Sequence, residues 1–165
     1  MVNARIRGET LTYKIGGPGT HLVTNGLAVL AAVKVAGGDL ALGALRLAEW
    51  RPPKGRGARK TIKTRTGSFT LIDESYNANP ASMTAALEAL AQSEPGPGGR
   101  RIAVLGDMLE LGDDAEALHA GLAECIENFH IDVVCTAGPL MNSLYNALPA
   151  SYRGLHAKDS TGLAS

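Results

Sequence analysis

The first third of the chain carries two helical patterns of apolar residues behind a weakly alternating start. Residues 1–15 alternate loosely between apolar and polar side chains, which is typical of a strand or hairpin. A buried helix is expected over His21 to Val35, stopped by Gly37-Gly38, and a second helix over Leu40 to Trp50, capped by Asp39. The helix pair shows no sheet of its own in this pattern, so it is interpreted as the end of a domain.

The rest of the chain alternates short apolar strands with helical segments. Residues 60–65 and 68–72 flank Thr66-Gly67, which is the pattern of a β-hairpin. Helical spacing follows from Pro80, and Asp159 or Ser160 caps a final helix. Because strands and helices alternate, the sequence predicts an α/β fold with a mainly parallel sheet. Further strands are expected over residues 101–105 and 132–136 and at His156, and further helices over residues 114–128 and 139–148.

Composition and charge both divide the chain. Pro and Gly dominate residues 51–57, so a domain boundary is expected between segments 1–57 and 58–165. Through Ile72, 12 Lys and Arg stand against 3 Asp and Glu, a net of +9, and beyond it 4 stand against 13, a net of −9. Such a split indicates two parts with different roles, although surface charge also drifts along many chains.

Composition also argues against several classes of protein. Cys125 and Cys135 lie in apolar patterns without metal-ligand spacing, as reduced core residues do in a cytoplasmic protein. The N-terminus lacks the pattern of a signal peptide, and no apolar run reaches the length that spans a membrane. The sequence therefore predicts a soluble cytoplasmic protein without a membrane partner, and a monomer is expected.

Five polar side chains lie where the strand over residues 68–72 gives way to a helix. They are Asp73, Glu74, Tyr76, Asn77 and Asn79. Asn79 is a preferred N-cap, and Pro80 fits the first helical turn because its missing N–H has no partner there. Open α/β sheets bind ligands at loops of this kind. A turn rich in Asn and Asp explains the same spacing, and the residues alone leave both readings open.

Two further groups of charged residues are candidates for ligand contacts. Asp107 and Glu110 follow a strand, where carboxylates hold a ligand amine or a metal-bound water, but a turn residue and a solvated residue are the alternative. Cations near the boundary suit phosphates, whereas nucleic acid is disfavoured because none of the seven aromatics alternates with them. A solvated hairpin also explains several of them, so Arg56, between two glycines, is the strongest candidate. The cluster is Arg51, Lys54, Arg56, Arg59, Lys60, Lys63 and Arg65.

His21 and Asn25 lie one helical turn apart at the start of a helix that follows a Gly-rich loop. Helix N-termini attract anions and Asn can pair with an adenine edge, so Asn25 is a candidate nucleotide contact and His21 a candidate metal ligand. A capped core helix is the alternative, because neither G-x-G-x-x-G nor G-x-x-x-x-G-K-[ST] occurs. The remaining histidines lack ligand spacing and are interpreted as structural: His119, His130 and His156.

Several stretches together resemble the Mur ligases, in particular the branch that joins D-alanyl-D-alanine to UDP-N-acetylmuramoyl-tripeptide. Asp-Glu-Ser-Tyr-Asn-Ala-Asn-Pro from Asp73 and Val-Leu-Gly-Asp-Met-Leu-Glu-Leu-Gly from Val104 are specific to that branch. Residues 21–28 resemble the family's H-N-x-x-N-A-L-A helix, and Lys54-Gly55-Arg56 resembles its G-R element. The likeness covers nearly the whole chain.

The resemblance implies a Rossmann-like C-terminal domain over residues 58–165, preceded by a helical remnant of the central ATP-binding domain over residues 1–57. It implies phosphorylation of the tripeptide carboxylate by ATP, with Mg²⁺, and attack by the dipeptide amine. The implied ATP contacts are Asn25, Arg56, Asp73, Glu74 and Tyr76, and the implied residues of the D-alanyl-D-alanine cleft are Asn77, Asn79 and Asp107.

Departures from the family pattern limit what the chain is expected to do alone. Leu22 stands where the family usually has Asn, Gly26 where it has Ala, and Glu74 where a second Asp is common. The phosphate-binding loop and magnesium ligands of the central domain, and a final Lys-Gly-Ser strand, have no counterpart in the sequence. The chain is therefore interpreted as a fragment, inactive alone, that supplies a closing lid. A non-catalytic module that binds nucleotide or dipeptide is an alternative, and a nucleic-acid-binding module is a weaker one.

Overall fold

The computed structural model describes residues 1–16, 19–51 and 53–164, which form two units, Met1–Tyr76 and Asn77–Ser165. Each unit contains a hydrophobic cluster of its own. Among the described residues, no helix is both long enough and apolar enough to cross a membrane.

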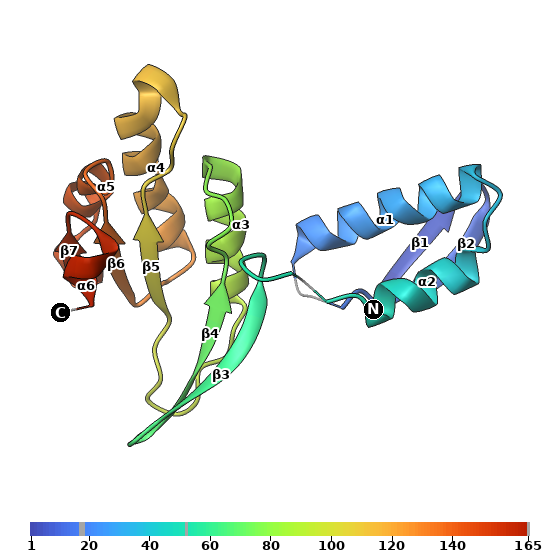
Figure 1. The fold of residues 1–165 in the computed structure, drawn as a ribbon, viewed down its shortest axis with the longest axis horizontal. Coiled ribbons are helices and arrows are strands. Elements are labelled where there is room, and N and C mark those ends of the chain that lie inside the picture. Colours follow the sequence, from blue (N-terminus) through green and yellow to red (C-terminus); the bar gives the residue numbers. More distant parts are fainter. Residues whose placement is uncertain (17–18, 52, 165) are drawn as a thin grey trace. The chain divides into compact units, whose positions relative to one another are not determined.

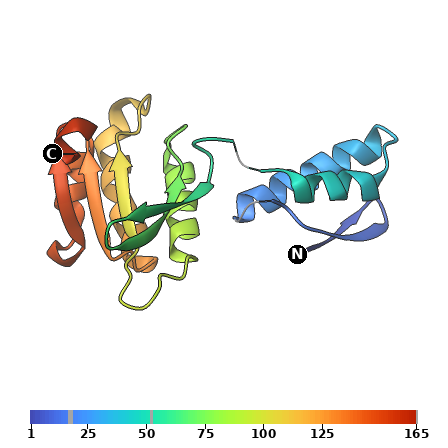
Figure 2. The same ribbon diagram turned by 60° about the horizontal axis from the view of Figure 1, so that its bottom comes forward.

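The first unit begins with a hairpin that packs against two helices. β1 (Val2–Ile6) pairs antiparallel with β2 (Glu9–Tyr13). α1 (Thr20–Val35) and α2 (Leu40–Glu49) lie side by side along this hairpin, as Figures 1 and 2 show. The predicted cap is confirmed, because the Asp39 carboxylate accepts hydrogen bonds from two amides of the first turn of α2, at 2.7 and 3.0 Å.

A small core joins these four elements, and it corrects two sequence predictions. Its buried residues are Ile6, Tyr13, Leu30 and Leu40. The hairpin expected from the alternation of residues 1–15 is confirmed, and it gives the helix pair a sheet of its own, with Ile6 and Tyr13 as its buried side chains. The expectation that the helix pair has no sheet is therefore wrong. The expectation that α1 is buried is also wrong, since Val29 is 50% exposed and Val35 is 70% exposed.

A second hairpin completes the first unit. β3 (Ala58–Thr64) pairs antiparallel with β4 (Gly67–Asp73), which confirms the predicted hairpin. Gly67 pairs with Thr64, so the connecting residues are Arg65 and Thr66, one position earlier than expected. The polar loop that follows Asp73 therefore leaves an antiparallel strand. The expectation that it leaves a strand of an open α/β sheet is wrong for this strand.

The second unit contains the predicted parallel sheet. β5 (Ile102–Gly106), β6 (Val133–Ala137) and β7 (Arg153–Ala157) lie in that order, and both neighbouring pairs are parallel (Figure 2). The α/β prediction is thus confirmed. The helices are α3 (Pro80–Ala91), α4 (Ala115–Asn128), α5 (Met141–Ala147) and α6 (Ser160–Leu163), with short 3₁₀ turns at Gly112–Asp114 and Ala150–Tyr152.

The core of the second unit lies where the sheet meets its helices. Its fully buried hydrophobic side chains include Leu87, Met108, Ile126, Ile131, Val134, Met141, Leu144 and Leu148. The expectation that β5 is a buried strand holds for one face, since Ala103 is buried, and fails for the other. Ile102 is 46% exposed and Val104 is 67% exposed. Parallel strands with one apolar face open to solvent are uncommon, because such sheets are ordinarily covered on both faces.

Candidate functional site

Backbone hydrogen bonds join the two segments that flank the second hairpin, residues 54–57 and 73–76. The Tyr76 amide donates to the Gly55 carbonyl at 3.0 Å, and the Gly57 amide donates to the Asp73 carbonyl at 2.9 Å. Gly55 and Gly57 have φ angles of 77° and 81°, in the left-handed region that favours glycine. A Cβ on Gly55 would lie 3.0 Å from the Tyr76 amide nitrogen, a backbone atom of the opposite segment. Glycine is therefore required for the close approach of these segments.

The joined segments bring four predicted ATP contacts to one end of the hairpin. The residues are Arg56, Asp73, Glu74 and Tyr76. Arg56 Cζ lies 4.0 Å from the centroid of the Tyr76 ring, which is the geometry of a cation–π contact. The Tyr76 side chain is 66% exposed and remains accessible to a ligand. The arrangement combines a cation, an aromatic face and two carboxyl groups.

Asp73 is held as a carboxylate by its own loop. The Ser75 hydroxyl donates to Asp73 Oδ1 at 2.6 Å, and the Ser75 amide donates to the same oxygen at 3.2 Å. These two bonds lower the pKa of Asp73 below its ordinary value, with smaller contributions from the Gly55 backbone and the Lys54 ammonium. Ser75 is a partner of the candidate residue Asp73 that the sequence prediction missed. An Asp followed two positions later by Ser is a local turn signal that would have found it.

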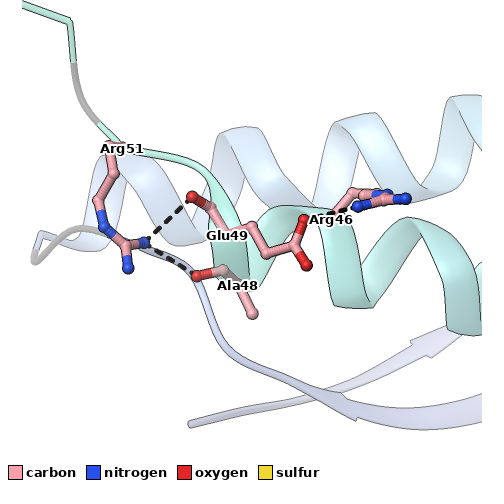
Figure 3. A network of polar contacts seen from close by, with 4 residues as sticks. All are labelled: Arg46, Ala48, Glu49 and Arg51. Atoms are coloured by element: carbon pink, nitrogen blue, oxygen red, sulfur yellow. Dashed lines mark hydrogen bonds and ion pairs between the residues drawn. The ribbon is translucent and has the colours of Figure 1, made fainter.

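The basic cluster does not act as one group. Arg51 Nη1 donates to the carbonyls of Ala48 and Glu49 at 3.0 and 3.2 Å (Figure 3). It also donates to the Trp50 carbonyl at 2.9 Å, so it satisfies carbonyls at the C-terminal end of α2. Arg46, in the last turn of the same helix, pairs with Glu49 at 2.8 Å. Arg51 therefore caps the C-terminal end of α2, whereas Arg56 is the member of the cluster that contacts the Tyr76 ring.

The two candidate residues on α1, His21 and Asn25, are not joined to the four residues at the end of the hairpin by any contact recorded between described residues. Asn25 is exposed on α1, and no hydrogen bond between described residues joins it to Arg56 or Tyr76. The side chain of His21, the candidate metal ligand, lies outside the described part of the structure. Gly26 is explained by packing, because a Cβ there would lie 3.0 Å from Ile15 Cδ1 and 3.4 Å from Tyr13 Cε2.

The candidates in the second unit have structural partners. Asn79 caps α3: its Oδ1 accepts from the Ser82 amide at 2.9 Å, and the Ser82 hydroxyl accepts from the Asn79 amide at 2.9 Å. Asp107 accepts from the amides of Leu140 and Met141 at 3.3 and 2.8 Å, at the start of α5. Asn77 is exposed, and the structure assigns it no such role. Glu110 is exposed too, as its alternative reading expected.

The histidines of the second unit are engaged within it, apart from the exposed His130. His119 is fully buried; its Nε2 accepts from the Met108 amide at 2.9 Å, and its Nδ1 lies 2.6 Å from the Ala115 carbonyl oxygen. His156 Nδ1 lies 2.8 Å from Thr136 Oγ1 at the carboxyl ends of β6 and β7. These contacts agree with the structural interpretation of both residues. Among the described side chains, no three His, Cys, Asp or Glu residues are grouped as a metal site requires.

The family of the chain follows from comparison with known proteins. Residues 58–163, more than half of the chain, match the family described as "Mur ligase, glutamate ligase domain". The chain belongs to the Mur ligase family. The matched region begins at β3 and ends in α6, so it includes the second hairpin as well as the parallel sheet.

Sequence comparison with individual relatives shows which branch of the Mur ligases the chain is similar to. The chain is 36% identical over 146 residues to the UDP-N-acetylmuramoyl-tripeptide–D-alanyl-D-alanine ligase of Escherichia coli (strain K12), covering 88% of this chain and 30% of that ligase. The likeness drawn from the sequence motifs is therefore confirmed. The chain spans less than a third of the length of that relative.

Solved structures show the same fold. MurF from Acinetobacter baumannii matches with a TM-score of 0.78 at 25% identity, covering 94% of this chain and 32% of the other. The MurF ligase from Thermotoga maritima, solved in complex with ADP, matches with a TM-score of 0.75 at 22% identity, covering 95% of this chain and 34% of the other. Both likenesses extend over nearly all of this chain.

Proposed function

We propose that this chain supplies the nucleotide-closing part of an ATP-dependent ligase that joins D-alanyl-D-alanine to UDP-N-acetylmuramoyl-tripeptide in peptidoglycan synthesis. The observation that carries the proposal is the joined corner of residues 54–57 and 73–76, where Arg56 stands over Tyr76. Membership of the Mur ligase family and the names of the relatives support it. The location that the resemblance implies, the cytoplasm, stays a prediction.

The proposed domains are a remnant of the central ATP-binding domain over residues 1–57 and a Rossmann-like C-terminal domain over residues 58–165. The family match supports this division, because it begins at residue 58. The hairpin of β3 and β4 would then belong to the C-terminal domain, although its contacts group it with the first unit.

The proposed roles follow from the chemistry of each side chain. Arg56 would bind a phosphate of ATP, because guanidinium N–H groups match phosphate oxygens. Asp73, held ionised by Ser75, would accept hydrogen bonds from the ribose hydroxyls, with Glu74 beside it. Asn25 would pair with the adenine edge.

Asn77, Asn79 and Asp107 contribute to the proposed dipeptide cleft in different ways. Asn77 is exposed and would contact D-alanyl-D-alanine directly. Asn79 and Asp107 would shape the cleft by fixing the starts of α3 and α5, because their side-chain oxygens already accept backbone hydrogen bonds. UDP-N-acetylmuramoyl-tripeptide would be bound mainly outside residues 1–165.

The described donor groups of this chain do not form a magnesium site by themselves. In the proposed ligase, Mg²⁺ would be held mainly by the central domain and would neutralise charge on the transferring phosphoryl group. The contribution of this chain is to orient the nucleotide and, on closure, to exclude water from it.

Phosphate release tests the proposal. The chain alone, given ATP, Mg²⁺, UDP-N-acetylmuramoyl-tripeptide and D-alanyl-D-alanine, is expected to release no phosphate above background, because it lacks a phosphate-binding loop. Appreciable dipeptide-dependent turnover would contradict the role of a partial site. Calorimetric titration addresses the alternative, a non-catalytic binding module, which predicts micromolar affinity of the chain alone for ATP or for the dipeptide.

A further inference from the structure

Arg56 and Tyr76 are twenty positions apart in sequence, and yet their side chains meet. Arg56 Cζ lies 4.0 Å from the Tyr76 ring centroid, although both side chains are exposed. An exposed pair of this kind contributes little to stability, because water competes for the cation. Its geometry therefore points to a purpose other than folding.

The stack is fixed by the backbone on both sides. The residues before and after Arg56 each bond to the opposite segment: the Gly55 carbonyl accepts from Tyr76, and the Gly57 amide donates to Asp73. Gly55 is buried, and a Cβ on it would lie 3.0 Å from the Tyr76 amide nitrogen. The main chain at Arg56 and the main chain at Tyr76 are thus held together before any ligand arrives.

The guanidinium in this stack keeps its hydrogen-bonding capacity. Among the described residues, no acceptor is recorded for the side-chain N–H groups of Arg56. The nearby carboxylate of Asp73 is already bonded to Ser75. A guanidinium has five N–H donors, and stacking on a ring engages its face rather than these donors. The donors of Arg56 are therefore open to an anion with several oxygens.

We propose that Tyr76 is a positioning residue that acts through Arg56: its ring fixes the guanidinium so that the N–H donors face the phosphate oxygens of a nucleoside triphosphate. The nature of the anion rests on the proposed function, whereas the stack itself does not. Pre-ordering a long side chain lowers the entropy lost on binding, so affinity for the phosphate chain rises without a direct contact from Tyr76.

Nuclear magnetic resonance of the chain without ligand tests the stack. The ring of Tyr76 is expected to shift the side-chain signals of Arg56 upfield. Tyr76→Ala is expected to abolish this shift, and Tyr76→Phe is expected to restore it. Arg65, in the hairpin connection, is the internal control whose signals remain unchanged. If the chemical shifts of the Arg56 side chain do not change in Tyr76→Ala, the stack does not exist in solution, and this result does not depend on the reaction of the protein.

Binding of two probes, inorganic tripolyphosphate and ATP, tests the positioning role. We expect Arg56→Ala to remove most of the affinity, and Tyr76→Ala to weaken both probes alike by about two- to five-fold, the range for an exposed cation–π contact. Tyr76→Phe is expected to recover the loss, and Arg65→Ala controls for general electrostatic attraction. A loss for ATP alone means that Tyr76 contacts the base directly, and this overturns the proposal. So does equal weakening by Arg65→Ala and Tyr76→Ala. No binding of tripolyphosphate by the unaltered chain, even at concentrations far above the micromolar range that the binding-module alternative predicts, also overturns it.

Neither measurement requires D-alanyl-D-alanine or turnover. A stack that is present and binds polyphosphate, in a chain that does not support ligation when it replaces the matching part of a full-length relative, would refute the proposed function alone. An absent stack in a protein that supports ligation would refute the positioning role alone.

Discussion

The guanidinium of Arg56 lies over the ring of Tyr76, with 4.0 Å between Cζ and the ring centroid. The contact spans the second hairpin, since one residue precedes β3 and the other follows β4. Arg56 belongs to the basic N-terminal part of the sequence. Tyr76 belongs to the polar motif that begins at Asp73 and resembles one branch of the Mur ligases. The hairpin between them acts as the connection that brings the two segments together.

Gly57→Ala is expected to loosen this corner. Alanine at a φ of 81° costs about 1–2 kcal/mol, and its Cβ would approach Glu74 Oε1 to 2.9 Å. Amide hydrogen exchange at Tyr76 should therefore accelerate about ten-fold. Gly67→Ala is the matched control, because a Cβ there meets nothing within 4 Å and its φ is not in the left-handed region. Equal effects of the two substitutions would argue against a strained junction at Gly57.

Ser75→Ala is expected to raise the pKa of Asp73 toward its ordinary value of about 3.9. The Ser75 hydroxyl is the largest cause of the lowered pKa in the folded chain. A carboxyl whose pKa is lower when folded adds stability above its unfolded pKa, and this stability is lost as pH falls through the folded pKa. The substitution should thus reduce the acid sensitivity of the loop below about pH 4. Carbon-13 titration of Asp73 measures the shift, and Ser68→Ala on β4 should leave it unchanged.

Asn77→Ala and Asn79→Ala are expected to differ although they lie two positions apart. Asn79 caps α3 through Ser82, so its loss should cost about 1 kcal/mol of stability. Asn77 is exposed, and its replacement should change stability by less than about 0.5 kcal/mol. Thermal unfolding compares the two variants directly. An equal loss of stability would show that Asn77 also has a structural partner.

Asp107→Ala is expected to destabilise the second unit by about 1–2 kcal/mol, since it leaves two amides at the start of α5 without their acceptor. Denaturant unfolding measures the change. Glu110→Gln, in the same loop but exposed, is the control and should be near neutral. An Asp107→Ala variant of unchanged stability would contradict the structural role and would favour a direct contact between Asp107 and a ligand.

Local signals in the sequence predicted the parts of the structure that depend on neighbouring residues. Asp39 and Asn79 were recognised as caps because a cap bonds to amides two or three positions away. The bonds from Asp107 to α5 span more than thirty positions, and the stack of Arg56 on Tyr76 spans twenty. No periodicity or spacing encodes such pairs, since they arise only when the chain has folded.

Burial was predicted wrongly for some apolar residues, because burial depends on which elements pack against a residue, and the local sequence pattern does not specify these elements. Val104 lies in an apolar run and yet is 67% exposed, because the helices of the second unit cover the opposite face of β5. Val35 is exposed for a similar reason, since α1 contacts the core cluster through Leu30 and Ala31. Apolar composition predicted the elements correctly and their environment only in part.

We propose that this chain completes a nucleotide site in a D-alanyl-D-alanine-adding ligase. The most direct measurement is ADP release by a chimera in which residues 1–165 replace the matching part of the Escherichia coli relative. We expect ADP release that requires both D-alanyl-D-alanine and UDP-N-acetylmuramoyl-tripeptide. It should fall at least ten-fold with Arg56→Ala, as expected when about 1.4 kcal/mol or more of phosphate binding is lost, and should persist with Arg65→Ala. A folded chimera that releases no ADP, or whose ADP release is indifferent to Arg56, would contradict the claim.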